Sequence, residues 1–192
     1  MNVTDIVGLS ESSGYSLEGS FTPDLVFSKL WLIDELAQIQ PEIDTMYVLG
    51  SWYGNLALLI DKSGKLSVRK IINVETNAEF LKTGQQLLKK HQVGNTQAMM
   101  QDANKLNYQQ LGNAGVVVNT ALNNIAGRDW FEHIPDGTLV VMQARDRDAE
   151  QQFSGLADIQ QKFPLSRVLY QGKLDLADPE TEYTRFMTIG IK

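Results

Sequence analysis

The residues that could do chemistry lie at four points, each where a run of apolar residues stops. Gly50 and Gly54 frame a short turn, and Glu75 ends the next apolar run. Asp102 and Asn119 close two further runs. Glycine lets the backbone approach a ligand, and a carboxylate roughly 20 residues farther on can accept hydrogen bonds from two ribose hydroxyls. The spacing therefore predicts a pocket for a nucleoside-type ligand.

Buried strands alternating with helices must hold these residues in place. This alternation predicts an α/β, doubly wound fold, with a mainly parallel seven-stranded sheet and helices on both faces. The last two strands have no helix between them and should form a C-terminal antiparallel hairpin at one edge. The expected strands are 47–49, 67–74, 96–100, 116–118, 138–142, 166–172 and 184–191, and the expected helices are 24–40, 56–60, 76–94, 105–110, 130–134 and 153–163.

The domain organisation follows from the same pattern. In a doubly wound sheet, ligands bind beyond the carboxyl ends of the strands, so the four polar points should converge there. We expect a core over 46–192, preceded at 1–45 by an arm and an amphipathic helix (24–40) that packs on the core. The first twenty residues, rich in serine and glycine, are either a flexible arm or a lid that orders over a ligand.

Composition excludes several classes of site. The chain has 192 residues, no cysteine and two histidines, so we expect neither a disulfide framework nor a metal site. The net charge of −6 argues against nonspecific nucleic-acid binding. The N-terminal segment lacks lysine and arginine, and no run reaches the roughly 18 apolar residues of a membrane span. These features predict a soluble, cytoplasmic protein without a membrane partner.

Taken together, the motifs resemble those of a known superfamily. Four segments, in order, are similar to the ligand motifs of S-adenosylmethionine-dependent methyltransferases with a Rossmann-like core (class I). The closing segments 172–176 and 183–191 resemble the final antiparallel hairpin of that superfamily. The four segments are Val48-Leu49-Gly50-Ser51-Trp52-Tyr53-Gly54, Val74-Glu75, Gln101-Asp102-Ala103 and Val117-Val118-Asn119-Thr120.

The resemblance implies S-adenosyl-L-methionine as the cofactor and assigns residues to its parts. Gly50 and Gly54 would line the methionine portion, and Glu75 would hold the ribose hydroxyls. Asp102 would bond the adenine amino group, with the Ala103 backbone beside it. The remaining residues that we assign to the cofactor site are Ser51, Trp52, Thr76 and Asn119.

Two departures from the superfamily pattern concern catalysis. Trp52 and Tyr53 crowd a first loop that is usually small, and Asn119 places an amide where many members carry a carboxylate. The resemblance puts Asn119 at the mouth of the fourth strand, where methyl transfer takes place. Asn119 and Tyr53 are therefore the candidate catalytic residues, with Tyr53 offering a hydroxyl to the substrate.

Each assignment has a structural alternative. Gly50 and Gly54 could serve turn geometry alone, Glu75 could be a polar helix entry, and Asp102 could cap a short helix. Asn119 could satisfy backbone groups at a strand end. The run 145–148, Arg-Asp-Arg-Asp, could be a self-neutralising loop or a lid that touches substrate.

The predicted function is S-adenosylmethionine-dependent methyl transfer to a small-molecule or protein acceptor. A sulfonium is already activated, so catalysis requires mainly positioning. The alternatives are a noncatalytic cofactor-binding or scaffold protein and, with less support, a nicotinamide-dependent oxidoreductase, because the first turn lacks the Gly-x-Gly-x-x-Gly pattern. A tRNA or DNA acceptor that docks locally and the oligomeric state stay open.

Overall fold

A seven-stranded mixed sheet forms the centre of the molecule. The computed structural model describes residues 17, 19–146, 152–178 and 181–192. The strand order is β3-β2-β1-β4-β5-β7-β6, with the first five strands parallel and β7 antiparallel to both of its neighbours. The predicted doubly wound sheet and its C-terminal hairpin are confirmed. The strands are β1 (Glu42–Leu49), β2 (Ser67–Glu75), β3 (Thr96–Met100), β4 (Val116–Asn119), β5 (Leu139–Arg145), β6 (Arg167–Ala177) and β7 (Glu182–Ile191).

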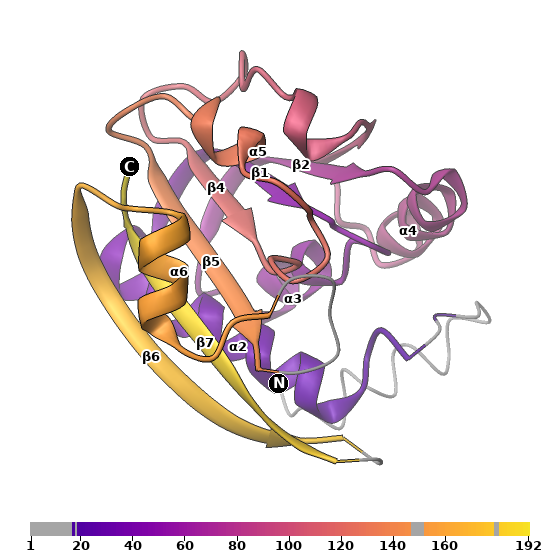
Figure 1. Cartoon of the computed structure of the whole chain (residues 1–192). Coiled ribbons are helices and arrows are strands. Elements are labelled where there is room, and N and C mark those ends of the chain that lie inside the picture. The colour runs from indigo at the N-terminus through magenta and orange to yellow at the C-terminus, as the bar shows by residue number, and fades with distance from the viewer. Residues whose placement is uncertain (1–16, 18, 147–151, 179–180) are drawn as a thin grey trace.

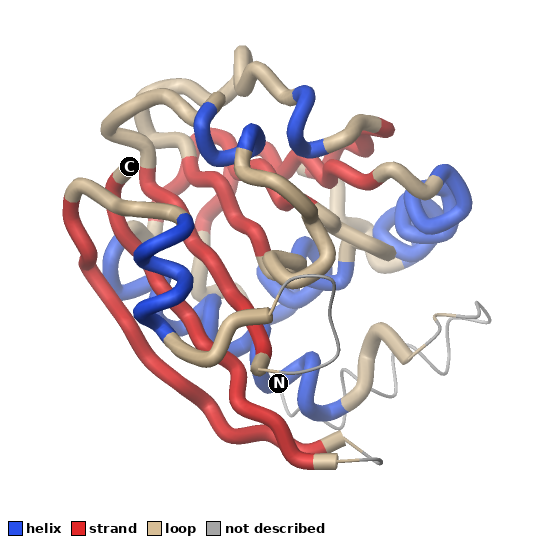
Figure 2. The backbone as a smooth tube through the Cα atoms, viewed as in Figure 1, coloured by secondary structure: helices blue, strands red, loops and turns tan. Residues whose placement is uncertain are grey.

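Helices cover both faces of this sheet (Figures 1 and 2). Strand β1 shows why, because its side chains alternate between two cores: Met46 and Val48 pack on one face, Tyr47 and Leu49 on the other. Figure 1 shows α2 and α3 behind the sheet and α6 in front of it. One face carries α2 (Pro23–Ile39), α3 (Asn55–Ser63) and α4 (Ala78–Lys90); the other carries η1 (Ala103–Lys105), α5 (Asp129–Glu132) and α6 (Leu156–Lys162).

Helix α2 is tied to the C-terminal half of the sheet. The Ser28 hydroxyl donates to Oε1 of Gln143 on β5 at 3.2 Å, and the Gln143 amide donates back to the Ser28 carbonyl at 3.0 Å. The Trp31 indole donates to the Tyr170 hydroxyl on β6 at 3.0 Å. Strand β1 starts at Glu42, so one strand crosses the expected boundary at residue 45. The arm expected over 1–20 lies largely outside the described residues.

Several predicted helix boundaries differ from the structure, and the differences at 76 and at 105–110 have a clear physical reason. Helix α4 begins at Ala78 rather than Thr76, because the Asn77 side chain is the cap and accepts from the backbone N–H groups of Glu79 and Phe80. The expected helix over 105–110 is instead the 3₁₀ turn η1, which ends at Lys105. The backbone φ of +50° at Tyr108 is incompatible with a right-handed helix there.

In the described part of the chain, no helix is long and apolar enough to cross a membrane. The cytoplasmic location stays a prediction.

Candidate active site

A large hollow of the described structure lies where the parallel strands end. It is a cavity of about 790 Å³, within the range of roughly 300–1,000 Å³ that is usual for small-molecule pockets. The carboxyl ends of β1, β2, β4 and β5 all contribute to its wall, as the sheet topology requires. The predicted residues in this wall are Gly50, Trp52, Glu75, Thr76, Asp102 and Ala103.

The turn after β1 brings backbone close to the pocket. Gly50 and Gly54 have φ values of +59° and +71°, a left-handed conformation that favours glycine. A Cβ on Gly50 would lie 2.7 Å from the Ala121 Cβ of the loop after β4. The Ser51 N–H donates to the Val74 carbonyl at 3.0 Å, which ties the turn to β2. Only glycine at position 50 allows these two loops to meet so closely.

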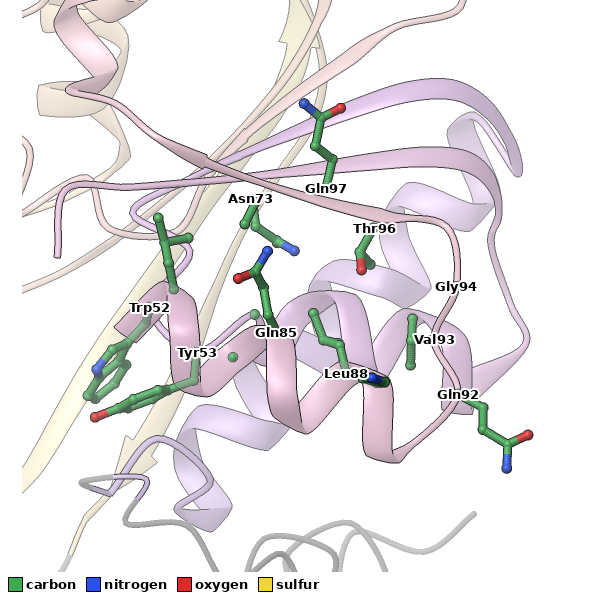
Figure 3. A pocket seen from close by; sticks show the side chains of 15 residues that line it. Trp52, Tyr53, Asn73, Gln85, Leu88, Gln92, Val93, Gly94, Thr96 and Gln97 are labelled. Atoms are coloured by element: carbon green, nitrogen blue, oxygen red, sulfur yellow. The ribbon is translucent and has the colours of Figure 1, made fainter. Parts of the chain in front are cut away.

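The aromatic residues of this turn lie to one side of the pocket. The rings of Trp52 and Tyr53 stack with centroids 5.5 Å apart, and Phe80 of α4 packs 4.9 Å from the Tyr53 ring. Trp52 lines both the large pocket and a second cavity of about 550 Å³ near Asn73 and Gln85, whereas Tyr53 and Gly54 line the second cavity and not the large pocket (Figure 3). The structure therefore does not bring the Tyr53 side chain into the wall of the large pocket.

The Glu75 carboxylate joins two ligand loops. Its Oε2 accepts from the Trp52 backbone N–H at 3.0 Å. Its Oε1 accepts from the N–H groups of Thr76 and Asn77, at 2.8 and 3.1 Å. Both oxygens are thus held by main-chain donors from two elements, which fixes the orientation of the carboxylate at the pocket wall. The polar helix-entry role is also present, because Glu75 accepts from the N–H of Asn77, the residue that caps α4.

Asp102 and Ala103 follow β3 on the same side of the pocket. Oδ1 of Asp102 accepts from the Asn104 N–H at 3.0 Å, so this residue does cap the short helix η1. Ala103 is buried, and the Trp130 backbone N–H donates to Oδ1 of Asn104 at 3.1 Å. This capping uses one carboxylate oxygen of Asp102, and the residue still lines the pocket.

Asn119 is placed behind the pocket rather than in its wall. The residue is fully buried, and its Oδ1 accepts from the Ala121 N–H at 3.0 Å. Its Nδ2 has no hydrogen-bond partner among the described residues. Thr120 and Ala121, the next residues, do line the pocket. Ser51 is likewise buried outside the wall, with no hydrogen-bond partner for its hydroxyl in the described structure.

Sequence reasoning missed the opposite side of the pocket, which is cationic. Lys29 of α2, Arg145 at the end of β5 and Arg185 of β7 line it. Burial, and then the charge of Arg185, lower the pKa of Lys29 to about 7. Arg145 carried a signal, since it opens a charged run after a strand. Lys29 and Arg185 carried none, because a lone cation in a helix or strand gives no indication of where it points.

Two buried asparagines orient this wall. The Asn55 amide donates to the Ser20 carbonyl at 2.9 Å, which attaches the segment before α2 to the start of α3. The Asn123 amide donates to the Arg145 carbonyl and its Oδ1 accepts from the Arg145 N–H, each at 2.8 Å. This reciprocal pair locks the loop after β4 to the end of β5. Residues 147 and 148 of the charged run lie outside the described residues.

The described residues contain no group of three or more histidine or acidic side chains placed to hold a metal ion. Along the sheet edge, the pocket is bounded by acids on its β2–β3 side, by the Gly50 turn at its centre and by cations on its β5–β7 side. Such a surface suits a ligand with hydroxyl and amino donors at one end and negative charge at the other.

Comparisons with known proteins agree with this architecture. The sequence matches no protein-family model and no curated protein. Its structure is similar to a putative RNA methyltransferase from Pyrococcus horikoshii, with a TM-score of 0.62 and 16% identity over 97% of this chain and 96% of that one. It is also similar to a coclaurine N-methyltransferase bound to N-methylheliamine and S-adenosylhomocysteine, with a TM-score of 0.62 and 11% identity over 86% of this chain and 73% of that one.

A third similar structure is TrmK from M. capricolum in complex with S-adenosylhomocysteine. It has a TM-score of 0.55 and 8% identity over 82% of this chain and 67% of that one. At such identities the likeness concerns the fold alone. The chain therefore has the fold of the class I, S-adenosylmethionine-dependent methyltransferases.

Proposed function

We propose that this protein binds S-adenosylmethionine in the large pocket and transfers its methyl group to an acceptor. The observation that carries the proposal is the Glu75 carboxylate, held at the pocket wall by backbone donors from the Gly50–Gly54 turn and from the start of α4. A carboxylate oriented beside a glycine turn, at the carboxyl edge of a parallel sheet, is suited to a ribose. Solved structures of the same fold contain S-adenosylhomocysteine, the product of such a transfer.

The residues around the turn fit this cofactor. Gly50 would face the methionine portion, whereas Gly54, which lines the second cavity and not the large pocket, would shape the turn. The indole N–H of Trp52, which has no hydrogen-bond partner among the described residues, offers a further donor at the wall. Glu75 would accept from the ribose hydroxyls, with Thr76 beside it. Asp102 and Ala103 would lie along the adenine. Ser51 would act from behind the wall by shaping the turn.

Methyl transfer from this cofactor requires little acid or base catalysis by side chains. When bound, the sulfonium supplies an activated methyl group: a bond from the acceptor to the methyl carbon forms, the C–S electron pair stays on sulfur, and the acceptor loses a proton. The chain must hold the acceptor in line and exclude water. Thr120 and Ala121 would form the floor there. Asn119 is then a positioning residue, which holds the Ala121 N–H, and Tyr53 supports the turn by packing.

A noncatalytic cofactor-binding protein is the second candidate. It is favoured by Asn119, whose amide oxygen is already used by the backbone and whose side chain does not line the pocket. This candidate shares the binding step and differs only in turnover. Incubation with labelled S-adenosylmethionine and extracts of small molecules, proteins or RNA separates the two, because a catalytic protein releases S-adenosylhomocysteine in proportion to methylated acceptor.

Calorimetric titration with S-adenosylhomocysteine tests the binding step. We expect saturable heat for the unaltered protein and an affinity about tenfold lower for Glu75→Gln, since the amide replaces one charged acceptor by a donor. Glu79→Gln is the matched control, because Glu79 is an exposed acid in the first turn of α4 outside the pocket wall.

Titration with NAD is the parallel experiment. Binding of NAD without binding of S-adenosylhomocysteine would contradict the proposal and favour the oxidoreductase alternative. The absence of heat and of any thermal shift at millimolar S-adenosylhomocysteine would also contradict it, for the enzyme and the noncatalytic binder alike.

A further inference from the structure

The charges of the large pocket are separated along the sheet edge. Asp102 and Glu75 follow β3 and β2, at one end of the strand order. Arg145 and Arg185 belong to β5 and β7, beyond the central strands β1 and β4. Lys29 of α2 joins the two arginines in the wall. The end of the pocket that the proposed cofactor's ribose and adenine do not use therefore carries three cations.

The two arginines are direct neighbours across the sheet. In the antiparallel pairing of β5 with β7, Arg145 is the register partner of Arg185. Like charges directly opposite one another destabilise a sheet. The Arg145 charge also helps to lower the pKa of Arg185, although burial is the larger cause. A fold selected only for stability has no reason to place two arginines at this position.

Arg185 also retains an unused donor. The residue is 5% exposed, and its guanidinium lies 5.8 Å from the Tyr183 ring. Its Nη1 donates to the Thr120 carbonyl at 3.5 Å, a long contact, and its Nε has no hydrogen-bond partner among the described residues. A buried guanidinium N–H without an acceptor costs stability unless a ligand supplies one.

Lys29 is a second buried cation of this wall. It is 8% exposed, and burial is the largest cause of its lowered pKa. Asp24, one turn earlier on α2, is the one described carboxylate whose charge acts on both Lys29 and Arg185. Oδ2 of Asp24 is already used, because it accepts from the Tyr183 hydroxyl at 2.6 Å. Asp24 is thus shared by Lys29 and Arg185.

We propose that the methyl acceptor is a small molecule bearing a carboxylate or a phosphate, which binds between Lys29 and Arg185. The inference rests on the proposed methyltransferase function, since it places this anion beside the loop after β4, where the acceptor would lie. The cations are enclosed in a pocket, and the chain as a whole carries a net charge of −6, so an extended polyanion such as duplex nucleic acid fits poorly. Arg145, held by Asn123, widens the positive wall.

The test uses simple anions as probes, with the cofactor site filled by S-adenosylhomocysteine. Thermal unfolding is followed in inorganic phosphate and in acetate, against chloride at equal ionic strength. We expect saturable stabilisation by phosphate, by acetate or by both, and the preferred anion identifies the group on the acceptor. In Lys29→Met and in Arg185→Met, the affinity for that anion should fall about tenfold or more. Lys65→Met is the control, because Lys65 pairs with Asp34 far from the pocket wall.

A second readout separates binding from a structural role. If these cations serve a ligand, Arg185→Met should be at least as stable as the unaltered protein in chloride, because it relieves the Arg145 repulsion while losing the anion effect. Lys29→Met provides the same comparison should the arginine variant not fold.

Three results would overturn the proposal. The first is the absence of any saturable anion effect beyond that of chloride. The second is an anion effect that survives in Lys29→Met and Arg185→Met. The third is competition between the anion and S-adenosylhomocysteine, accompanied by weaker S-adenosylhomocysteine binding in these variants, which would assign the cations to the cofactor carboxylate. If S-adenosylhomocysteine does not bind at all, the proposed function fails separately, and the anion titrations without it report on the cations alone.

Discussion

The charged side chains at the two ends of the pocket differ in how fully they are paired with partners inside the protein. At the acidic end, both oxygens of Glu75 accept hydrogen bonds from main-chain N–H groups, and Asp102 accepts one from the backbone of η1. At the cationic end, Lys29 and Arg185 are buried, repel one another and share a single carboxylate. The acidic end is complete without a ligand, whereas the cationic end is not.

This difference shows what each end contributes. Charged groups that are already satisfied hold a fixed geometry, which lowers the entropic cost of binding. Charged groups that lack partners raise the energy of the ligand-free protein and return that energy when an anion binds. We infer that the acidic end selects by shape and the cationic end selects by charge.

The largest effect that would test this comparison is the pH dependence of stability at Lys29. Its pKa is lowered from 10.5 to about 7, so the unfolded chain holds a proton that the folded protein lacks between these values, and stability rises with pH across that window. Arg185, Arg145 and Asp24 are the charged groups that face it.

Lys29→Met should therefore be more stable than the unaltered protein below pH 7, by up to roughly 5 kcal/mol, with the gain vanishing toward pH 10.5. Urea unfolding at a series of pH values measures this difference, with Lys65→Met as the control. A gain independent of pH would show that Lys29 is not an unpaired buried cation.

A second prediction concerns the rigidity of the acidic end. Gly50→Ala should destabilise the protein by about 2–3 kcal/mol, because the left-handed backbone is strained and the new Cβ meets Ala121. Gly64→Ala is the matched control: its φ is +62°, but nothing lies within 4 Å of a Cβ there, so about 1 kcal/mol is expected. Equal losses in urea unfolding would mean that the loops after β1 and β4 do not meet closely.

The smallest expected effect is a change in anion affinity that depends on the Asp24 carboxylate. Tyr183→Phe removes the hydroxyl that donates to Asp24, leaving that carboxylate free to neutralise the cations. We expect phosphate affinity to fall by about threefold to fivefold, equivalent to roughly 1 kcal/mol. Tyr170→Phe is the control, since its hydroxyl accepts from Trp31 away from the pocket wall. Unchanged affinity in Tyr183→Phe would indicate that Asp24 does not compete with the anion.

Much of the acidic end could be predicted from the sequence. Gly50 follows β1, Glu75 ends β2 and Asp102 follows the edge strand β3. Parallel strands bring their carboxyl ends to one edge of the sheet. The direction of the Tyr53 side chain could not be predicted in this way. The backbone at Trp52 is left-handed, with φ of +52°, and Tyr53 packs against Phe80 of α4. Which way a turn residue points depends on its backbone dihedrals rather than on its position after a strand.

The sequence by itself determined the succession of strands along the chain, the antiparallel ending and the polar residues at the ends of the parallel strands. These features depend on local apolar periodicity. Only the tertiary structure decided the cationic end. Lys29 and Arg185 lie far apart in the chain, and the docking of α2 through Ser28 and Gln143 brings them together. Burial and charge contact are long-range properties, so no local pattern could have marked either residue as part of a binding site.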